Sequence, residues 1–184
     1  MKKLLALAIF AFFLFSCNNE KPAEEKTAAK TDTVAAADNK PKPAEFADPK
    51  YAELGKKGLA ALSAGDVDGW MTSFSDNATY VWNNFDSLQG KAKIAEYWKK
   101  RRTEVIDSLT FHDEIWLPVK VNQPQSVEAP GVWLLSWYRV HAKYKTGKSM
   151  NQLIHTVMHF DGNDKIDRLI QYLDKAAINA AASK

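Results

Sequence analysis

Every tryptophan and every tyrosine of this 184-residue chain lies at or beyond position 51. These side chains bury large apolar areas, so the region that holds them is the region that can form a core. Residues 18–50 are mostly Asn, Lys, Glu, Ala, Thr and Pro, with Phe46 as their one aromatic residue. Such a segment buries too little apolar area to offset its conformational entropy. We therefore expect a disordered spacer over residues 18–50 and one folded domain over residues 51–180.

The first 17 residues have the features of an export signal. Residues 1–3 are Met-Lys-Lys, and residues 4–15 are all apolar. A membrane-spanning helix needs roughly 20 apolar residues, so this shorter run predicts a signal peptide. Residues 14–17, Leu-Phe-Ser-Cys, resemble the bacterial lipobox, in which the cysteine is lipidated and becomes the mature N-terminus. The alternative is an ordinary secretory signal with an incidental Cys17.

A lipid on Cys17 would hold the mature chain on a membrane, because each buried acyl CH₂ contributes about 0.8 kcal/mol. We therefore expect a protein of the bacterial cell envelope, on the outer membrane or at the periplasmic face. Cys17 is also the only cysteine in the chain. This excludes a disulfide scaffold, a cysteine-based zinc site and an iron–sulfur cluster within one chain. The sequence predicts no cofactor and no metal site.

The charges of the chain are nearly balanced, with 25 basic and 22 acidic residues and a net charge of +3. Proteins that bind nucleic acid normally have a clustered basic face, so we expect no nucleic-acid partner. The basic run at residues 99–102 lies near the end of an expected helix, where the helix dipole favours positive charge. We interpret it as a solvated helix face.

Apolar residues at helical spacing predict three helices in the first half of the domain. The first stripe ends before Gly65, which is typical of a helix end, and the second follows Asp66, which is typical of a helix start. Residues 78–82, between the second and third helices, are β-branched and aromatic and predict a strand. A loop over residues 83–90 follows. The third stripe consists of Ile94, Tyr97, Trp98, Arg101 and Val105.

After the third helix the apolar pattern changes to a period of two, which predicts strands over residues 109–121, 132–145, 151–160 and 165–173. Turns are expected at residues 146–148 and 161–164, and a short helix over residues 174–182. In the long second strand, one face has Trp133, Leu135, Trp137, Arg139 and His141. The other face has Leu134, Ser136, Tyr138, Val140 and Tyr144.

This order of elements resembles the NTF2-like or SnoaL-like α+β cone, over roughly residues 51–180. The resemblance implies a curved antiparallel sheet packed on three N-terminal helices, a short C-terminal helix and a pocket open at one end. The family includes enzymes and pocket proteins of many kinds, so it implies no single function. The matching motifs are Asp66-x-x-x-Trp70-x-x-x-Phe74-x-Asp76-x-Ala78, Gly90-x-x-x-Ile94-x-x-Tyr97-Trp98, Trp133-x-x-x-Trp137, Phe160-Asp161-Gly162-x-x-Lys165-Ile166 and Tyr172-x-Asp174.

Enzymes of this fold place an acid or a histidine on the pocket wall, where it moves a proton to or from the substrate. The candidate catalytic residues here are His155, Asp174 and Tyr172. Asp174 could instead cap the last helix, and His155 could be a core histidine that bonds a backbone carbonyl. His155 and His159 would lie about 13 Å apart on one strand, too far to bind one metal together.

The many tryptophans favour an apolar pocket more strongly than a catalytic site. The candidate ligand-binding residues are the aromatic walls Trp82, Trp116 and Trp137 and the polar anchors Tyr80, Arg139 and Gln171. The alternative is that the tryptophans only fill the interface between the sheet and the helices.

The preferred interpretation is an envelope-anchored pocket protein that binds a small, mostly apolar molecule. The first alternative is an isomerase, dehydratase or hydrolase of the same fold that uses the His155, Asp174 and Tyr172 set. The second is an interaction module that forms a homodimer through its open sheet face. A deep cavity with an acid or histidine of shifted pKa would favour the enzyme. A dry aromatic cavity would favour binding, and a filled cone would favour the interaction module.

The lipobox generates a direct prediction. Replacing Cys17 with Ala should move the protein from the membrane fraction to the soluble fraction, because the acyl chains would no longer be attached. Cell fractionation followed by immunoblotting measures this change. Membrane association that survives the substitution would contradict lipidation at Cys17.

Overall fold

The computed structural model describes residues 40–126 and 128–183 of the chain. In this part, a seven-stranded sheet has the strand order β1-β4-β5-β6-β7-β2-β3 and packs with four α-helices. The elements are β1 (Ala44–Phe46), α1 (Lys50–Ala64), α2 (Val67–Met71), β2 (Phe74–Trp82), β3 (Ser87–Gln89), α3 (Lys91–Lys100), a π-helical turn (Arg101–Val105), β4 (Ile106–Val121), β5 (Gly131–Tyr144), β6 (Ser149–Phe160), β7 (Ile166–Tyr172) and α4 (Lys175–Ala182).

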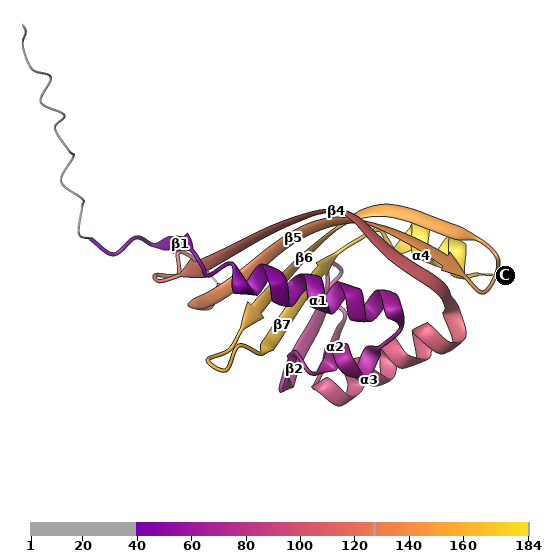
Figure 1. Cartoon of the computed structure of the whole chain (residues 1–184), viewed down its shortest axis with the longest axis horizontal. Coiled ribbons are helices and arrows are strands. Elements are labelled where there is room, and N and C mark those ends of the chain that lie inside the picture. Colours follow the sequence, from indigo (N-terminus) through magenta and orange to yellow (C-terminus); the bar gives the residue numbers. More distant parts are fainter. Residues whose placement is uncertain (1–39, 127, 184) are drawn as a thin grey trace, which may run out of the picture. The chain divides into compact units, whose positions relative to one another are not determined.

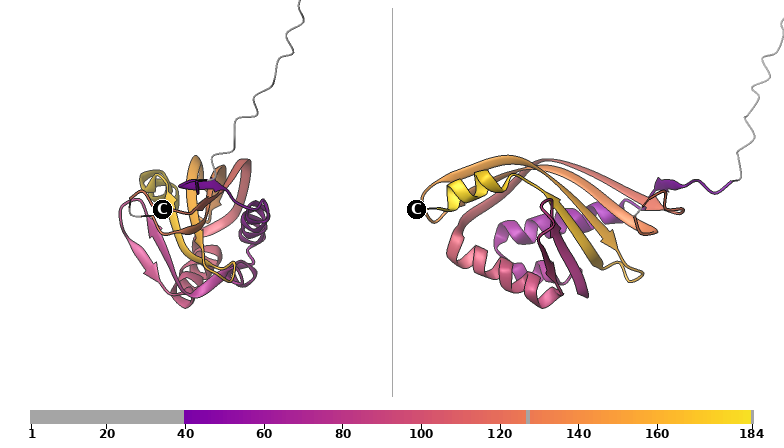
Figure 2. Two further views of the ribbon diagram at one scale, coloured as in Figure 1. Left: turned by 90° about the vertical axis from the view of Figure 1, so that its left-hand side faces the viewer. Right: turned by 180° about the vertical axis from the view of Figure 1, so that it is seen from behind.

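The sheet is curved, and α1, α2 and α3 all lie on its concave side (Figures 1 and 2). We call the sheet face toward these helices the inner face and the opposite one the outer face. Neighbouring strands from β4 to β7 are antiparallel, whereas β2 pairs with β7 in parallel. The α+β cone predicted from the sequence is therefore confirmed, with one parallel pair in its sheet.

The junction between the first two helices is built as its sequence predicts. Gly65 ends α1 in the left-handed conformation at φ 80°, which costs a residue without a Cβ little. The carboxylate of Asp66 then accepts a hydrogen bond of 2.7 Å from the Gly69 N–H and caps α2. The second helix ends at Met71, and β2 begins at Phe74, before the strand that was predicted over residues 78–82.

Helix α1 lies unusually close to its aromatic neighbours at two glycines. A Cβ on Gly55 would stand 2.4 Å from the Trp116 ring, and a Cβ on Gly58 would stand 3.1 Å from the Trp70 ring. The first distance is impossible for a real side chain, so the contact of α1 with β4 requires a glycine at position 55. The two indole rings therefore define how closely α1 approaches the sheet and α2.

The expected spacer over residues 18–50 ends earlier than predicted. Residues 44–46 form β1, which pairs with β4 on the side away from β5. Ala44 lies opposite Val121 and Phe46 opposite Val119. The Asn122 N–H also donates to the Pro43 carbonyl at 2.9 Å. The side chains of β1 are exposed, so this pairing depends on backbone groups and leaves no apolar pattern in the sequence. Residues 1–39, and with them Cys17, lie outside the described residues.

The C-terminal helix was correctly predicted. It packs against the turn between β5 and β6, where the Thr146 hydroxyl donates to the Ala181 carbonyl at 2.6 Å. None of the helices in the described ranges is both long enough and apolar enough to cross a membrane.

Candidate functional site

An interior cavity of about 80 Å³ lies between the inner face of the sheet and the helices. Its wall is mostly aliphatic and aromatic, and it receives side chains from α1, α3 and the long strands. Alternation along β5 and β6 points every second residue of these strands toward it. Apolar residues that define the wall include Leu59, Ile106, Val140, Ala142, Ile154 and Leu169.

A row of buried polar side chains crosses the inner face at this cavity. Ser136, Thr156 and Gln171 are register neighbours on β5, β6 and β7. The Thr156 hydroxyl shares a hydrogen bond of 2.6 Å with the Tyr138 hydroxyl, and the Tyr80 hydroxyl donates to Gln171 Oε1 at 2.6 Å. The Ser136 hydroxyl donates to the Thr156 carbonyl at 2.9 Å, so each side chain of this row has at least one hydrogen-bond partner.

Burial keeps the phenols of this cavity neutral. It raises the pKa of Tyr80 well above the usual value and also raises the pKa of Tyr138, because a phenolate would lose its hydration there. Bonds from Thr156 and Gln171 act in the opposite direction on the Tyr138 pKa but are smaller effects. The two hydroxyls therefore act as hydrogen-bonding groups at neutral pH and cannot serve as proton-accepting bases.

Arg101 is the one charged side chain among the residues that line the interior cavity. It begins the π-helical turn after α3, and its Cζ atom lies 5.6 Å from the centre of the Tyr97 ring. The sequence pattern includes Arg101 in the third apolar stripe, but the basic run at residues 99–102 was predicted to be a solvated helix face. A charged residue at a stripe position was the available signal that Arg101 faces inward.

A second hollow of about 440 Å³, the adjoining cleft, shares Trp98, Arg101 and Gln171 with the interior cavity. It lies between α3, the β2–β3 turn and α4. At its rim, Lys175 forms an ion pair of 2.6 Å with Asp86 and stands 5.2 Å above the Trp82 ring. Hydrogen bonds from Lys175 and Asn84 lower the pKa of the Asp86 carboxyl, so this acid is ionised and neutralised.

Three of the predicted ligand-binding residues face these hollows. Tyr80 and Gln171 line the interior cavity, and Trp82 lines the adjoining cleft together with Gln171. Trp116 also lies on the inner face, where its ring packs 6.2 Å from that of Tyr138 and covers Gly55, but it is outside the cavity lining.

The structure places Trp137, His155 and Tyr172 side by side on the outer face. They are register neighbours on β5, β6 and β7, with ring centres 4.5 Å apart for the first pair and 5.5 Å for the second. His155 Nδ1 lies 2.9 Å from the Ser136 carbonyl, which is the structural role considered for it above. Arg139, on the same face, pairs with Asp113 at 3.2 Å.

The three candidate catalytic residues therefore do not meet at the cavity. His155 and Tyr172 lie on the far side of the sheet from it, because adjacent residues on a strand point to opposite faces. Asp174 caps α4, where its carboxylate accepts a hydrogen bond of 2.8 Å from the Ala176 N–H. The residues that line the interior cavity include no Asp, Glu, His, Lys or Cys.

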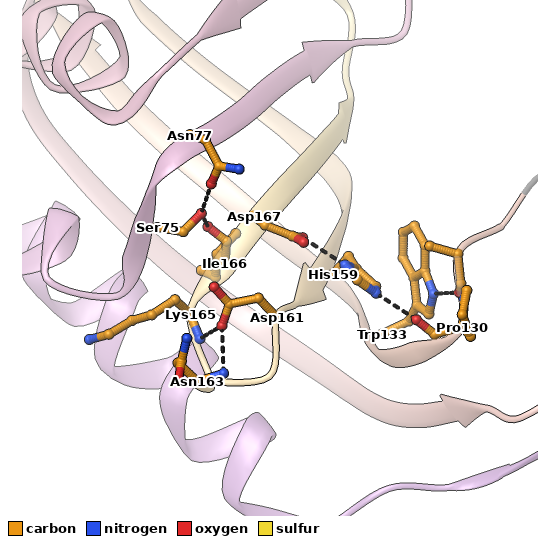
Figure 3. A network of polar contacts seen from close by, with 11 residues as sticks. Ser75, Asn77, Pro130, Trp133, His159, Asp161, Asn163, Lys165, Ile166 and Asp167 are labelled. Carbon is orange, nitrogen blue, oxygen red and sulfur yellow. Dashed lines mark hydrogen bonds and ion pairs between the residues drawn. The ribbon is translucent and has the colours of Figure 1, made fainter.

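A separate polar cluster lies near the β6–β7 turn (Figure 3). His159 has Asp167 Oδ1 2.6 Å from its Nδ1 and the Pro130 carbonyl 3.1 Å from its Nε2. Both neighbours are acceptors, and Trp133 donates to the adjacent Ala129 carbonyl at 2.8 Å. These bonds hold the start of β5 against β6 and β7. In the part of the chain that the structure describes, no three His, Cys, Asp or Glu side chains form a group that could hold a metal ion.

No family model matches the chain, and no curated protein matches its sequence. Solved structures do match its fold. An NTF2-like protein of unknown function from Burkholderia pseudomallei gives a TM-score of 0.59 at 11% identity, over 73% of this chain and 98% of that one. A protein from Xanthomonas campestris, described as a proposed polyketide cyclase, gives 0.58 at 15% identity, over 73% and 97%.

A third match, a LEH-like epoxide hydrolase from Mycobacterium tuberculosis, gives a TM-score of 0.52 at 14% identity, over 72% of this chain and 89% of that one. Each of the three matched chains is covered over at least 89% of its length. The domain therefore has the NTF2-like fold that the sequence motifs predicted.

The buried phenols predict how stability responds to alkaline pH. Above about pH 10 the tyrosines of the unfolded chain ionise, whereas Tyr80, with its raised folded-state pKa, stays protonated. The unfolded state then binds fewer protons than the folded state, so the free energy of unfolding falls as pH rises.

The Tyr80→Phe variant should lose less stability than the wild type between about pH 9 and pH 11, by about 1 kcal/mol. Urea denaturation at each pH measures the difference. Tyr172→Phe is the matched control, because Tyr172 is 46% exposed. Equal slopes for wild type and Tyr80→Phe would contradict the burial of the Tyr80 hydroxyl.

Proposed function

We propose that the domain binds a small, mostly apolar molecule in the interior cavity and the adjoining cleft. The observation that supports this most is the lining of the cavity, which is apolar and aromatic apart from a few converging polar groups. Ligand sites in proteins typically have this composition. In this proposal Trp82 supplies an aromatic wall, and Tyr80 and Gln171 supply the polar anchors.

The sizes of the two hollows define how a ligand would fit. The interior cavity of about 80 Å³ is smaller than the cavity of about 150 Å³ that holds benzene in an engineered protein core. The cleft of about 440 Å³ falls within the usual range of roughly 300–1,000 Å³ for ligand sites. The ligand would therefore insert one apolar end into the cavity and keep most of its volume in the cleft.

Binding fits the cavity better than isomerase, dehydratase or hydrolase chemistry does. A general acid or base must reach the substrate and have a pKa near the working pH. The cavity lining offers neutral phenols and one guanidinium instead, and the His155, Asp174 and Tyr172 set lies elsewhere. Two structural neighbours are described as a proposed polyketide cyclase and as an epoxide hydrolase. At their low identity to this chain these descriptions do not transfer.

We also propose that the domain works in the bacterial cell envelope, held to the membrane by a lipid on Cys17. The support is the apolar run that ends at the sole cysteine. The intervening residues would give the domain reach from the membrane surface.

Filling the cavity tests the binding proposal. The probe is N-phenyl-1-naphthylamine, an uncharged dye that fluoresces in apolar surroundings. The wild-type domain should bind it saturably, and Ala142→Leu should raise its Kd roughly tenfold, which is about 1.4 kcal/mol. Ala142 is buried and lines the cavity, so the added carbons would occupy the space for the dye.

The control is Ala180→Leu, the same change at an exposed position of α4, which should leave dye binding unchanged. Thermal melting confirms that each variant is folded. Native mass spectrometry of the protein purified from its own host would then look for a retained small molecule. Lack of saturable dye binding by the wild type, with no retained molecule, would refute the proposal.

A second proposal concerns the outer face, which could pair with a second copy of the chain. Ile115 is 60% exposed there and Leu153 66% exposed, beside the stacked Trp137, His155 and Tyr172. Apolar side chains gathered on one exposed surface commonly indicate an interface.

Sedimentation equilibrium tests this pairing. The wild type should behave as a dimer, and the Ile115→Asp, Leu153→Asp double variant as a monomer, because two buried unpaired charges would oppose association. Phe46→Asp is the control, since Phe46 is 80% exposed on β1 at the edge of the sheet, opposite Val119 and four residues along β4 from Ile115. A monomeric wild type at micromolar concentration would contradict the dimer.

A further inference from the structure

We propose that the ligand of this site has a carboxylate, which Arg101 binds where the interior cavity meets the adjoining cleft. The inference rests on the binding function proposed above and specifies the chemical class of the molecule, an apolar body with a carboxylic acid. Four observations support it: the position of Arg101, the lack of an acid to pair with it, the donors beside it and the neutralised acid of the cleft.

Arg101 stands at the junction of the two hollows. It is among the residues that line both, and it is half-buried. The π-helical turn that it begins is a rare element that often occurs at functional sites. Its guanidinium lies over the Tyr97 ring and near the Tyr144 phenol, where it lowers the pKa of Tyr144 against the larger, opposite effect of burial.

No carboxylate of residues 40–126 or 128–183 forms an ion pair with Arg101. Two other cations of this region are paired with acids: Lys175 with Asp86 at 2.6 Å and Lys99 with Asp68 at 2.6 Å. Partial burial removes water from a guanidinium, and without an ion pair nothing compensates for the lost hydration. An anionic group on a ligand would supply that counter-charge, and the planar fork of arginine fits the two oxygens of a carboxylate.

The polar groups beside Arg101 are also hydrogen-bond donors. The Trp98 Nε1–H is buried and has no hydrogen-bond partner within the described part of the chain. Trp98 lines both hollows, as Arg101 does. Gln171 uses its amide oxygen to accept from Tyr80, and its amide nitrogen, which also acts on Tyr138, is a donor. Ionised carboxylates only accept hydrogen bonds, so they match a site composed of donors.

The remaining acid of the cleft does not oppose this assignment. Asp86 is paired with Lys175 and accepts a further bond of 2.7 Å from Asn84, so its charge is already compensated at the rim. The junction therefore has a net positive charge from Arg101. The apolar part of the ligand would extend from there into the interior cavity or along the Trp82 ring.

The test compares two ligands that differ only in the head group, 2-naphthoate and its uncharged amide, 2-naphthamide. Isothermal titration calorimetry with the wild-type domain should show naphthoate binding roughly tenfold or more tightly than naphthamide, since hydrogen bonds to charged groups are the stronger ones. Arg101→Gln should abolish this preference by weakening naphthoate binding to the level of naphthamide binding. Arg139→Gln, the same change on the outer face, should preserve the preference.

A second measurement does not depend on any variant folding. Added salt should weaken wild-type binding of naphthoate and leave that of naphthamide nearly unchanged, because salt screens a charge pair at a partly exposed site. Equal affinities of the two ligands, or a preference that survives Arg101→Gln, would overturn the carboxylate assignment while the binding function stands. Failure of the wild type to bind both ligands and the neutral dye would overturn both proposals.

Discussion

The alternation of side chains along β5, β6 and β7 is the constraint on which the rest of this structure depends. Each strand sends one residue to the helices and the next to the outer face, so neighbours in sequence become separated by the thickness of the sheet. Tyr138 thus lines the cavity and Ser136 lies buried on the same face, whereas Trp137 between them stacks on His155 outside. One chain segment in this way builds two chemically different surfaces, an apolar interior with a polar strip and an exposed aromatic row.

The inner surface becomes a cavity because the helices cover it without filling it. Gly55 and Gly58 bring α1 into direct contact with the Trp116 and Trp70 rings, and the two glycines and Trp70 form one side of the cavity. On another side, α3 ends in a π-helical turn that presents Arg101 to the interior. The result is an apolar space with one cation at its exit. The two proposals therefore concern two parts of one ligand. The apolar wall would hold its apolar body, and Arg101 would bind its carboxylate.

Much of the fold could be predicted from the sequence, because helical and strand periods report directly which elements form. The two faces of β5 were also predicted residue by residue, but the pattern contained no sign of which face the helices cover. The predicted site therefore mixed residues of both faces: Tyr80 and Gln171 line the cavity, whereas Arg139 and His155 lie outside it. β1 was missed because it joins the sheet through backbone hydrogen bonds and leaves its side chains exposed.

Sequence alone determined the order of the elements, the capping roles of Gly65 and Asp66, and the expectation of a lipid on Cys17, since each depends on residues close together in the chain. The tertiary structure decided that Arg101 faces the cavity and that Tyr80 meets Gln171, 91 positions away. Such pairings arise from the parallel register of β2 with β7 and from the angle at which α3 lies on the sheet. Local pattern cannot encode them, because they depend on contacts between segments that the sequence keeps far apart.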